Sequence, residues 1–215
     1  MTRTLLCFGD SNTYGSVPLV TQNDPHRRYG PDTRWTRICA GDLGPGWEVV
    51  EQGLPGRTAQ LDDTFMGAHM NGVAGLRIAL ESCGPIDAMT IMLGTNDTKA
   101  SFAVPPVQIA GGIAALLNIA LSQAMQDRHG GFRVLLIAPA PVRETGCLTG
   151  VFWGGRERSL ALAGLYRDLA QVYGTGFLDA GAHIEVSATD GVHFEPEMHR
   201  KFGSVVAQAV RGLVG

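Results

Sequence analysis

Five short apolar runs recur along the chain, at residues 4–8, 47–51, 88–92, 133–138 and 176–179. The first run is rich in Leu and Phe and is broken by Gly-Asp, which is typical of a buried strand that ends in a tight turn. The other four runs match it in character. The pattern therefore predicts five strands.

Segments with helical periodicity lie between these runs. In residues 107–128 apolar side chains recur every three or four positions, and residues 158–172 carry a leucine stripe of the same kind. A third helix is expected over 195–213, because Pro196 suits the first turn of a helix. Strands that alternate with helices predict an α/β fold, whose parallel sheet is covered by helices on both faces.

The length of 215 residues and the hydrophobic content of 45% are enough for one substantial core, and no change in composition divides the chain. We therefore expect a single domain over residues 1–215. Two irregular insertions, 16–32 and 139–155, leave strand ends and are expected to form pocket walls near the site, although they also fit ordinary surface loops.

Charge and composition exclude several classes of protein. The 17 basic and 20 acidic residues give a net charge of -3, so there is no positive excess with which to bind nucleic acid. The longest weakly polar stretch, 109–124, is too short to cross a membrane. No apolar segment with a small-residue cleavage site precedes the first strand in this sequence, so no leader is expected. The scattered Cys7, Cys39, Cys83 and Cys147 fit neither a disulfide scaffold nor a metal site. Reduced, mostly buried thiols and a cytoplasmic location are expected.

The first strand leads into the sequence GDSNT, which places Ser11 at the carboxyl edge of the sheet, where open α/β sheets bind their ligands. A serine hydroxyl is a weak nucleophile that needs a base, and the base needs an acid that holds it in one tautomer. Near the other end of the chain, the sequence DGVH offers Asp190 as the acid and His193 as the base. By itself, a DxxH pair is more often structural.

Two further turns lie at strand ends and supply groups that stabilise a developing oxyanion. Asn96, in GTND, has a carboxamide that can donate a hydrogen bond. Gly56, in GLPGRT, has no side chain to block its own amide from a ligand. Together with the Ser11 amide they form a candidate oxyanion hole, although each glycine turn alone is more often only a turn.

Taken together, GDSNT, GLPGRT, GTND and DGVH resemble the motifs of the SGNH, or GDSL-type, hydrolase superfamily in order and approximate spacing. Within that superfamily, LLCFGDSNTYG, RWTRICA and IMLGTNDTKASF are similar to the bacterial arylesterase and acyltransferase subgroup, which acts on small acyl esters. The resemblance implies a three-layer, flavodoxin-like α/β/α fold with a five-stranded, mainly parallel sheet. It also implies an enzyme that needs no cofactor and no metal.

The resemblance assigns a role to each motif residue. Ser11 becomes the nucleophile and the first oxyanion donor, and Asp190 and His193 complete the catalytic triad. Gly56 and Asn96 become the other two oxyanion donors. The four motifs span almost the whole chain, and their joint occurrence is far more specific than the GDS sequence alone.

One of these assignments has an alternative, and one motif position departs from the family. Gly53 is also available as the second oxyanion donor, and Gly56 is preferred because the family's donor commonly precedes a polar residue and a threonine. Asn12 stands where many relatives have an apolar residue. This departure leaves the triad intact but puts the polarity of the pocket in question.

Five residues are expected to contact the substrate. Lys99 and Phe102 follow the oxyanion asparagine and are placed at the entrance, and Val192 lies between the two triad residues, near the acyl group. Asn12 and Trp153 complete the set. A small acyl pocket is predicted. The resemblance also implies a homo-oligomer, and the apolar group that ends the second insertion fits such an interface.

The predicted function is that of a serine esterase that cleaves small, short-chain (acetyl-like) esters through an acyl-enzyme on Ser11, and the resemblance implies that acyl transfer to alcohols can accompany hydrolysis. A carbohydrate acetyl esterase is the alternative. Two rivals are a metal-dependent phosphohydrolase, with Asp10, Asp97, Asp190 and His193 around a divalent ion, and a non-catalytic carbohydrate-binding protein. Otherwise Asp10 and Asp97 are expected to accept turn amides.

Overall fold

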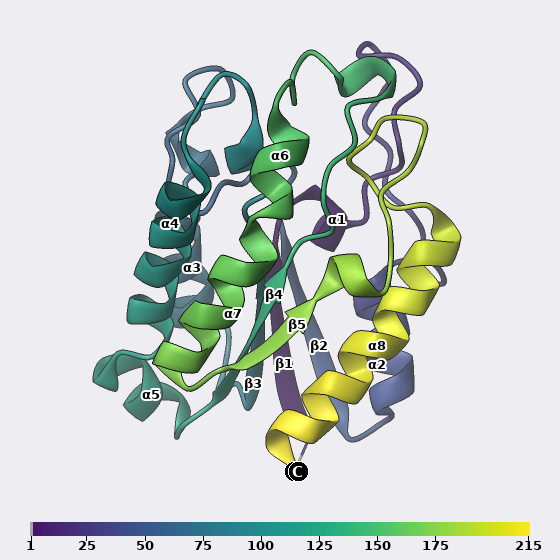
Figure 1. Cartoon of the computed structure of the whole chain (residues 1–215). Helices are drawn as coiled ribbons and strands as arrows, with labels where there is room; N and C mark the ends of the chain where they lie inside the picture. Colours follow the sequence, from purple (N-terminus) through teal and green to yellow (C-terminus); the bar gives the residue numbers. More distant parts are fainter. Residues whose placement is uncertain (1) are drawn as a thin grey trace.

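A computed structural model describes residues 2–215, and its centre is a five-stranded sheet in the order β2-β1-β3-β4-β5 (Figure 1). All neighbouring strands are parallel. The strands are β1 (Arg3–Gly9), β2 (Trp47–Gly53), β3 (Ala88–Met92), β4 (Arg133–Ala138) and β5 (Gly176–Asp179). The predicted α/β fold with a five-stranded parallel sheet is confirmed.

The inner strands are apolar because helices cover them on both faces. Every residue of β3 is buried, and β1 is buried from Leu5 onward. Within the sheet, Leu6 of β1 lies between Val50 of β2 and Met89 of β3. The edge strands β2 and β5 are only partly buried, which explains why their sequences mix polar and apolar residues.

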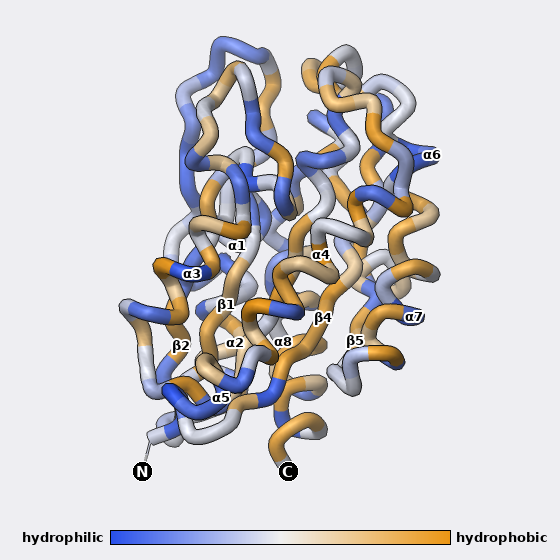
Figure 2. The backbone as a smooth tube through the Cα atoms, turned by 90° about the vertical axis from the view of Figure 1, so that its left-hand side faces the viewer, coloured by the Kyte–Doolittle hydropathy of each residue, from blue (hydrophilic) through white to orange (hydrophobic). Residues whose placement is uncertain are grey.

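A layer of helices packs on each face of the sheet (Figure 1). On one face α2 (Trp35–Leu43) packs against α8 (Pro196–Val214). On the other face α4 (Pro106–Ala120) packs between α3 (Gly72–Ser82) and α7 (Leu162–Tyr173). Figure 2 shows that β1 and β4, which lie between these layers, are mostly hydrophobic.

The clearest predicted helix is interrupted. Residues 107–128 form α4 and then a separate helix, α5 (Gln123–His129), so the prediction of one continuous helix is wrong. The break occurs because Ser122 caps α5, where its Oγ atom accepts the Met125 amide at 3.4 Å. The hydrophobic periodicity continues across the break, which is why the pattern alone does not reveal it.

The other two predicted helices are present with shifted ends. Residues 158–172 fall in α6 (Gly155–Leu160) and α7, which Ala161 separates. The helix expected over 195–213 is α8, which begins at Pro196. The helices α2 and α3 were not singled out by the pattern, and both complete the layers described above.

Two predictions from composition can be compared with the fold. Cys7 and Cys39 are buried, whereas Cys83 and Cys147 are partly exposed, and all four are free thiols. No single helix within residues 2–215 is long and apolar enough to span a membrane. Among the described residues, one bent pair of helices, α4 and α5 at 52° to each other, reaches that length and composition when the two are taken together.

The carboxyl ends of the strands point to the upper side of the molecule in Figure 1, where both insertions lie. The two insertions contact each other, because the Gln22 side chain donates to the Cys147 carbonyl at 2.7 Å. The first insertion also contacts the loop before α8, since the Leu19 amide donates to the Asp190 carboxylate at 2.9 Å. These contacts enclose the region above the sheet in which the candidate site lies.

Candidate active site

The first strand delivers Ser11 to the site through a close backbone turn. Gly9 ends β1, and a Cβ atom there would collide with a side chain of the following turn, so only glycine fits. The carboxylate of Asp10 accepts the Asn12 amide at 3.0 Å and caps the short helix α1 (Ser11–Tyr14). The Ser11 side chain is therefore held at the end of β1, where it is 6% exposed.

The loop before α8 holds Asp190 and His193 against each other. Oδ2 of Asp190 lies 2.6 Å from Nδ1 of His193 and also accepts the Leu19 amide at 2.9 Å. Oδ1 accepts the amides of Val192 at 2.9 Å and His193 at 3.0 Å. Burial alone would raise the pKa of Asp190, but the His193 ring and the amides of His193 and Leu19 outweigh it and hold the pKa at about 2. The carboxylate is ionised and fixes the ring through Nδ1.

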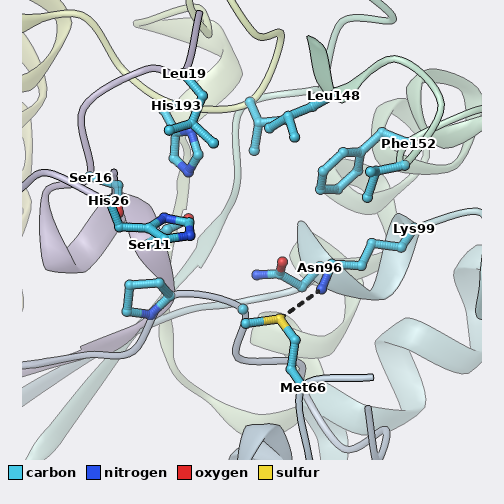
Figure 3. Close-up of a pocket in the computed structure, with 14 residues that line it drawn as sticks. Ser11, Ser16, Leu19, His26, Met66, Asn96, Lys99, Leu148, Phe152 and His193 are labelled. Atoms are coloured by element: carbon cyan, nitrogen blue, oxygen red, sulfur yellow. Dashed lines mark hydrogen bonds between the residues drawn. The ribbon is translucent and has the colours of Figure 1, made fainter. Parts of the chain in front are cut away.

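Ser11 and His193 line one cavity of about 190 Å³. Figure 3 shows the His193 ring pointing toward Ser11. Because Asp190 occupies Nδ1, the nitrogen that faces Ser11 is Nε2. In space, the imidazole of His193 therefore lies between the carboxylate of Asp190 and the hydroxyl of Ser11. This is the arrangement that turns a serine into a nucleophile.

Gly56 and Asn96 border the same cavity. Gly56 has a φ of 92°, and its amide takes part in no backbone hydrogen bond within residues 2–215. Asn96 is oriented by a bond from Nδ2 to the Arg57 carbonyl at 3.1 Å. Gly53 ends β2, does not line the cavity, and lies so close to the Tyr14 backbone that a Cβ atom would collide with it. The geometry therefore favours Gly56 over Gly53.

A buried arginine cross-links the strand ends below the site. Nη1 of Arg57 donates to the Gly9 carbonyl at 2.8 Å and also to the Gln52 carbonyl. Its guanidinium carbon lies 4.2 Å from the centre of the Phe8 ring. Burial lowers the pKa of Arg57 to about 10, while the nearby Asp10 opposes that shift. Arg57 thus joins the end of β1 to the end of β2, directly below the nucleophile turn.

The five expected substrate contacts divide into two groups. Lys99 and Val192 line the cavity, whereas Asn12, Phe102 and Trp153 do not. Asn12 is 3% exposed, and its Nδ2 donates to the Val192 carbonyl at 3.0 Å. Trp153 is 67% exposed, and the Phe102 ring centre lies 6.0 Å from the Lys99 ammonium. The structure therefore places these three side chains outside the lining of the cavity that holds Ser11 and His193.

Several residues that were not singled out from the sequence complete the cavity. The first insertion contributes Ser16, Leu19 and His26, and the second contributes three apolar residues. The insertions themselves were the sequence signal for these positions. Met66, in contrast, comes from a loop that carries no motif, and no signal in the sequence pointed to it. The apolar residues of the second insertion are Leu148, Val151 and Phe152.

The carboxylates of the metal-site alternative do not converge. Within residues 2–215, no three metal-ligating side chains lie together. Asp97 accepts the Ala59 amide with both carboxylate oxygens, each at 3.0 Å. Burial raises the pKa of Asp97 to about 7 and that of Asp10 to about 6. Asp10 and Asp97 therefore hold backbone turns beside the cavity, and the convergence that a divalent ion needs is not found in this part of the chain.

Similar proteins match nearly the whole length of the chain. The family described as GDSL-like lipase/acylhydrolase matches residues 7–201. Among solved structures, Est24, a carbohydrate acetylesterase from Sinorhizobium meliloti, is 38% identical with a TM-score of 0.91, over 98% of this chain and 99% of its own. The aryl esterase of M. smegmatis is 37% identical with a TM-score of 0.92, over 99% of this chain and 100% of its own.

A further solved structure, of a carbohydrate acetylesterase family member from Sinorhizobium meliloti, is 33% identical with a TM-score of 0.88 and is covered completely, as is this chain. No curated protein matches the sequence. The fold of this chain therefore has counterparts, over nearly its whole length, in solved structures of an aryl esterase and of carbohydrate acetylesterases.

Proposed function

The chain belongs to the GDSL-like lipase/acylhydrolase family of ester hydrolases, and on that premise we propose that it is a serine esterase for short, acetyl-like carboxylic esters. One observation carries the proposal: the His193 ring, held by Asp190 at 2.6 Å, points toward Ser11 inside a cavity (Figure 3). A serine beside a base that is oriented by a carboxylate is the arrangement that acyl transfer requires.

In the first half of the reaction, Ser11 Oγ attacks the carbonyl carbon of the ester and passes its proton to Nε2 of His193. Asp190, which is ionised, stabilises the imidazolium that forms. The carbonyl oxygen becomes an oxyanion, which accepts hydrogen bonds from the amides of Ser11 and Gly56 and from Nδ2 of Asn96. His193 then protonates the leaving oxygen, and the alcohol departs from the acyl-enzyme.

In the second half, His193 takes a proton from a water molecule that attacks the acyl-enzyme, and the acid is released as Ser11 regains its proton. An alcohol that occupies the place of the water receives the acyl group by the same steps. The apolar side chains of Leu148, Val151 and Phe152 line the cavity and reduce the space for competing water. We propose acyl transfer to alcohols as a second outcome of the same acyl-enzyme.

The size of the cavity supports a short acyl group. Its volume is about 190 Å³, and the side chains of Met66, Lys99 and Val151 close it on one side. Val192, between the two triad residues, contributes a further apolar surface and is itself buried. A rate maximum at octanoyl or longer in a chain-length series of aryl esters would contradict the proposed preference.

Replacing the serine tests the proposal. Ser11→Ala removes the nucleophile, so kcat for a short aryl acetate should fall by about 10^4-fold or more with no loss of folding. Ser16→Ala is the matched variant, because Ser16 lines the same cavity and should cost less than about tenfold. Folding is compared by circular dichroism. Equal losses in the two variants would contradict a specific role for Ser11.

Deacetylation of a carbohydrate is the second candidate function. It is favoured by Ser16 and His26, whose polar side chains border the cavity on the side of Ser11 (Figure 3), where a hydroxyl-rich leaving group finds hydrogen-bond partners. It also agrees with the similarity to Est24. Steady-state kcat/KM for an acetylated sugar and for an aryl acetate distinguishes the two functions, since the favoured substrate gives the higher value.

Assembly and location are part of the proposal. Trp153, at the end of the second insertion's apolar group, is 67% exposed, and exposed apolar side chains of this kind favour contacts between copies of the chain. We propose a homo-oligomer that uses Trp153, in the cytoplasm, where free cysteines such as Cys83 and Cys147 stay reduced. Light scattering on a sizing column tests the assembly, and a monomer at micromolar concentration would contradict it.

A further inference from the structure

A second cavity, of about 350 Å³, lies next to the active-site cavity. Met66, Lys99 and Val151 line both cavities, so these three side chains form the wall between them. The second cavity does not contain Ser11, His193 or any other residue with a role in the proposed reaction apart from that shared wall. Its chemistry therefore has to be derived from its own lining.

The charged groups of the second cavity satisfy each other. The Lys99 ammonium lies 3.1 Å from Oδ2 of Asp63, and both side chains are largely buried. Oδ1 of Asp63 accepts the amides of Phe65 and Met66, each at 2.9 Å. The opposite charges are paired and hydrogen-bonded, and the exposed lining of the cavity is mostly apolar. Its other residues are Phe65, Met66, Ala100, Ser101, Gly150 and Val151. Such a lining suits an alkyl group better than a charged or sugar ligand.

Met66 is the part of the wall that can turn aside. Its side chain is 45% exposed, and its only polar contact is that of Sδ with the Lys99 ammonium at 3.7 Å. Its methyl group lies over Gly56, within 2.6 Å of the place where a Cβ atom of that glycine would stand. Methionine is unbranched and rotates freely. Val151, in contrast, is fixed by its carbonyl, which accepts the Ala100 amide at 2.8 Å.

The proposed mechanism directs the acyl part of a bound ester toward this wall. The leaving oxygen must lie beside His193, which protonates it, and the carbonyl oxygen must lie at Gly56 and Asn96. The remaining direction at the carbonyl carbon runs away from His193. Figure 3 shows Met66 and Lys99 on the side of the cavity opposite His193.

We propose that the second cavity is a subsite for longer acyl chains and that Met66 is the specificity-determining residue that closes it. The inference rests on the proposed esterase function. With Met66 over Gly56, a short acyl group fills the first cavity and stops at the wall. When the Met66 side chain turns aside, the alkyl chain of a longer ester extends between Lys99 and Val151 into the second cavity.

The test compares p-nitrophenyl hexanoate with p-nitrophenyl acetate as a ratio of kcat/KM values. Met66→Ala opens the wall, so the ratio should rise about 16-fold if two methylenes of the hexanoyl chain become buried, because each is worth about fourfold. Met66→Leu keeps the volume of the wall, and the ratio should stay within about twofold of the wild-type value. Both esters are assayed with the same variant, so any general effect of that variant on folding or on kcat cancels in the ratio.

A second substitution shows whether the second cavity receives the chain. Gly150 lines that cavity, and a Cβ atom on it would meet no other atom within 4 Å, so a larger side chain fits there. Met66→Ala combined with Gly150→Leu should return the ratio toward the wild-type value. An unchanged ratio in Met66→Ala, or a rise that Gly150→Leu does not reverse, would overturn the inference. Absence of Ser11-dependent hydrolysis in the wild type would instead overturn the proposed function.

Discussion

The two sides of the active-site cavity are built on different principles. On one side, which holds Ser11 and His193 and which we call the fixed side, polar groups are buried and bonded to the backbone. Asp190 alone accepts three amides there. The opposite side, which we call the exchangeable side, is the wall formed by the side chains of Met66, Lys99 and Val151 on loops. Met66 is 45% exposed there. The chemistry therefore depends on geometry that is fixed by the backbone, whereas the choice of acyl group depends on side chains that can be exchanged.

Asp190→Asn should have the largest effect among substitutions on the fixed side, apart from loss of the nucleophile itself. The amide has the size of the carboxylate but cannot stabilise the imidazolium or hold the required tautomer, so kcat should fall by about 10^4-fold. Turnover of an aryl acetate measures it, with Asp168→Asn on the exposed face of α7 as the control. A loss of kcat below tenfold would contradict this account, because the fixed side would then not carry the chemistry.

Asn96→Ala should come next. Removing one oxyanion donor typically lowers kcat by about 10^2 to 10^3-fold, and KM should change little because the bond strengthens in the transition state. The control is Asn118→Ala, which changes an exposed position of α4. An increase in KM without a loss of kcat would show that Asn96 binds the ester equally in the ground state and in the transition state. Asn96 would then belong to the exchangeable side of the cavity.

Asn12→Ala tests a residue that holds the fixed side together. Its side chain bonds the Val192 carbonyl, and its own carbonyl accepts the Trp35 indole at 3.0 Å. Losing the side-chain bond should lower kcat by about two- to tenfold without raising KM. Asn12→Leu, which keeps the volume, should lose a similar amount. A higher KM in both variants would show instead that Asn12 contacts the substrate.

Asp97→Asn should have the smallest effect on turnover and should instead change the stability of the fold. The pKa of Asp97, about 7, lies above its ordinary value of 3.8, so the folded state binds the proton more tightly. This contribution is complete below about pH 4 and is lost as the pH rises toward 7. The unfolding free energy of the variant relative to wild type should therefore rise with pH, by at most about 1.4 kcal/mol per unit. Urea unfolding at three pH values measures it, and a constant difference would contradict it.

The sequence could predict those arrangements of the fixed side that are local. Asp190 and His193 are three positions apart, and the turn between them brings the carboxylate onto the ring. Gly9 and Ser11 share one tight turn at the end of β1. The apolar runs similarly predicted the positions of the five strands along the chain, since each strand forms from adjacent residues.

The exchangeable side could not be predicted, because loops far apart in the sequence assemble it. Met66 reaches the cavity only through the turn that Asp63 stabilises, and no motif marks that turn. Trp153 and Phe152 are neighbours in one apolar group, yet only Phe152 faces the cavity. The same limit applies to one residue of the fixed side, Asn12, because the direction of its side chain depends on Val192, 180 positions away. Such long-range contacts leave no local pattern.

The role of Ser11 as the nucleophile is tested most directly by covalent labelling. The protein is treated with diethyl p-nitrophenyl phosphate, digested, and examined by mass spectrometry for the modified peptide. One diethylphosphoryl group per chain should be found on Ser11, in proportion to lost activity, and Ser11→Ala should take up none. A label on another residue such as Ser16, or complete inactivation without a label on Ser11, would contradict the proposed mechanism.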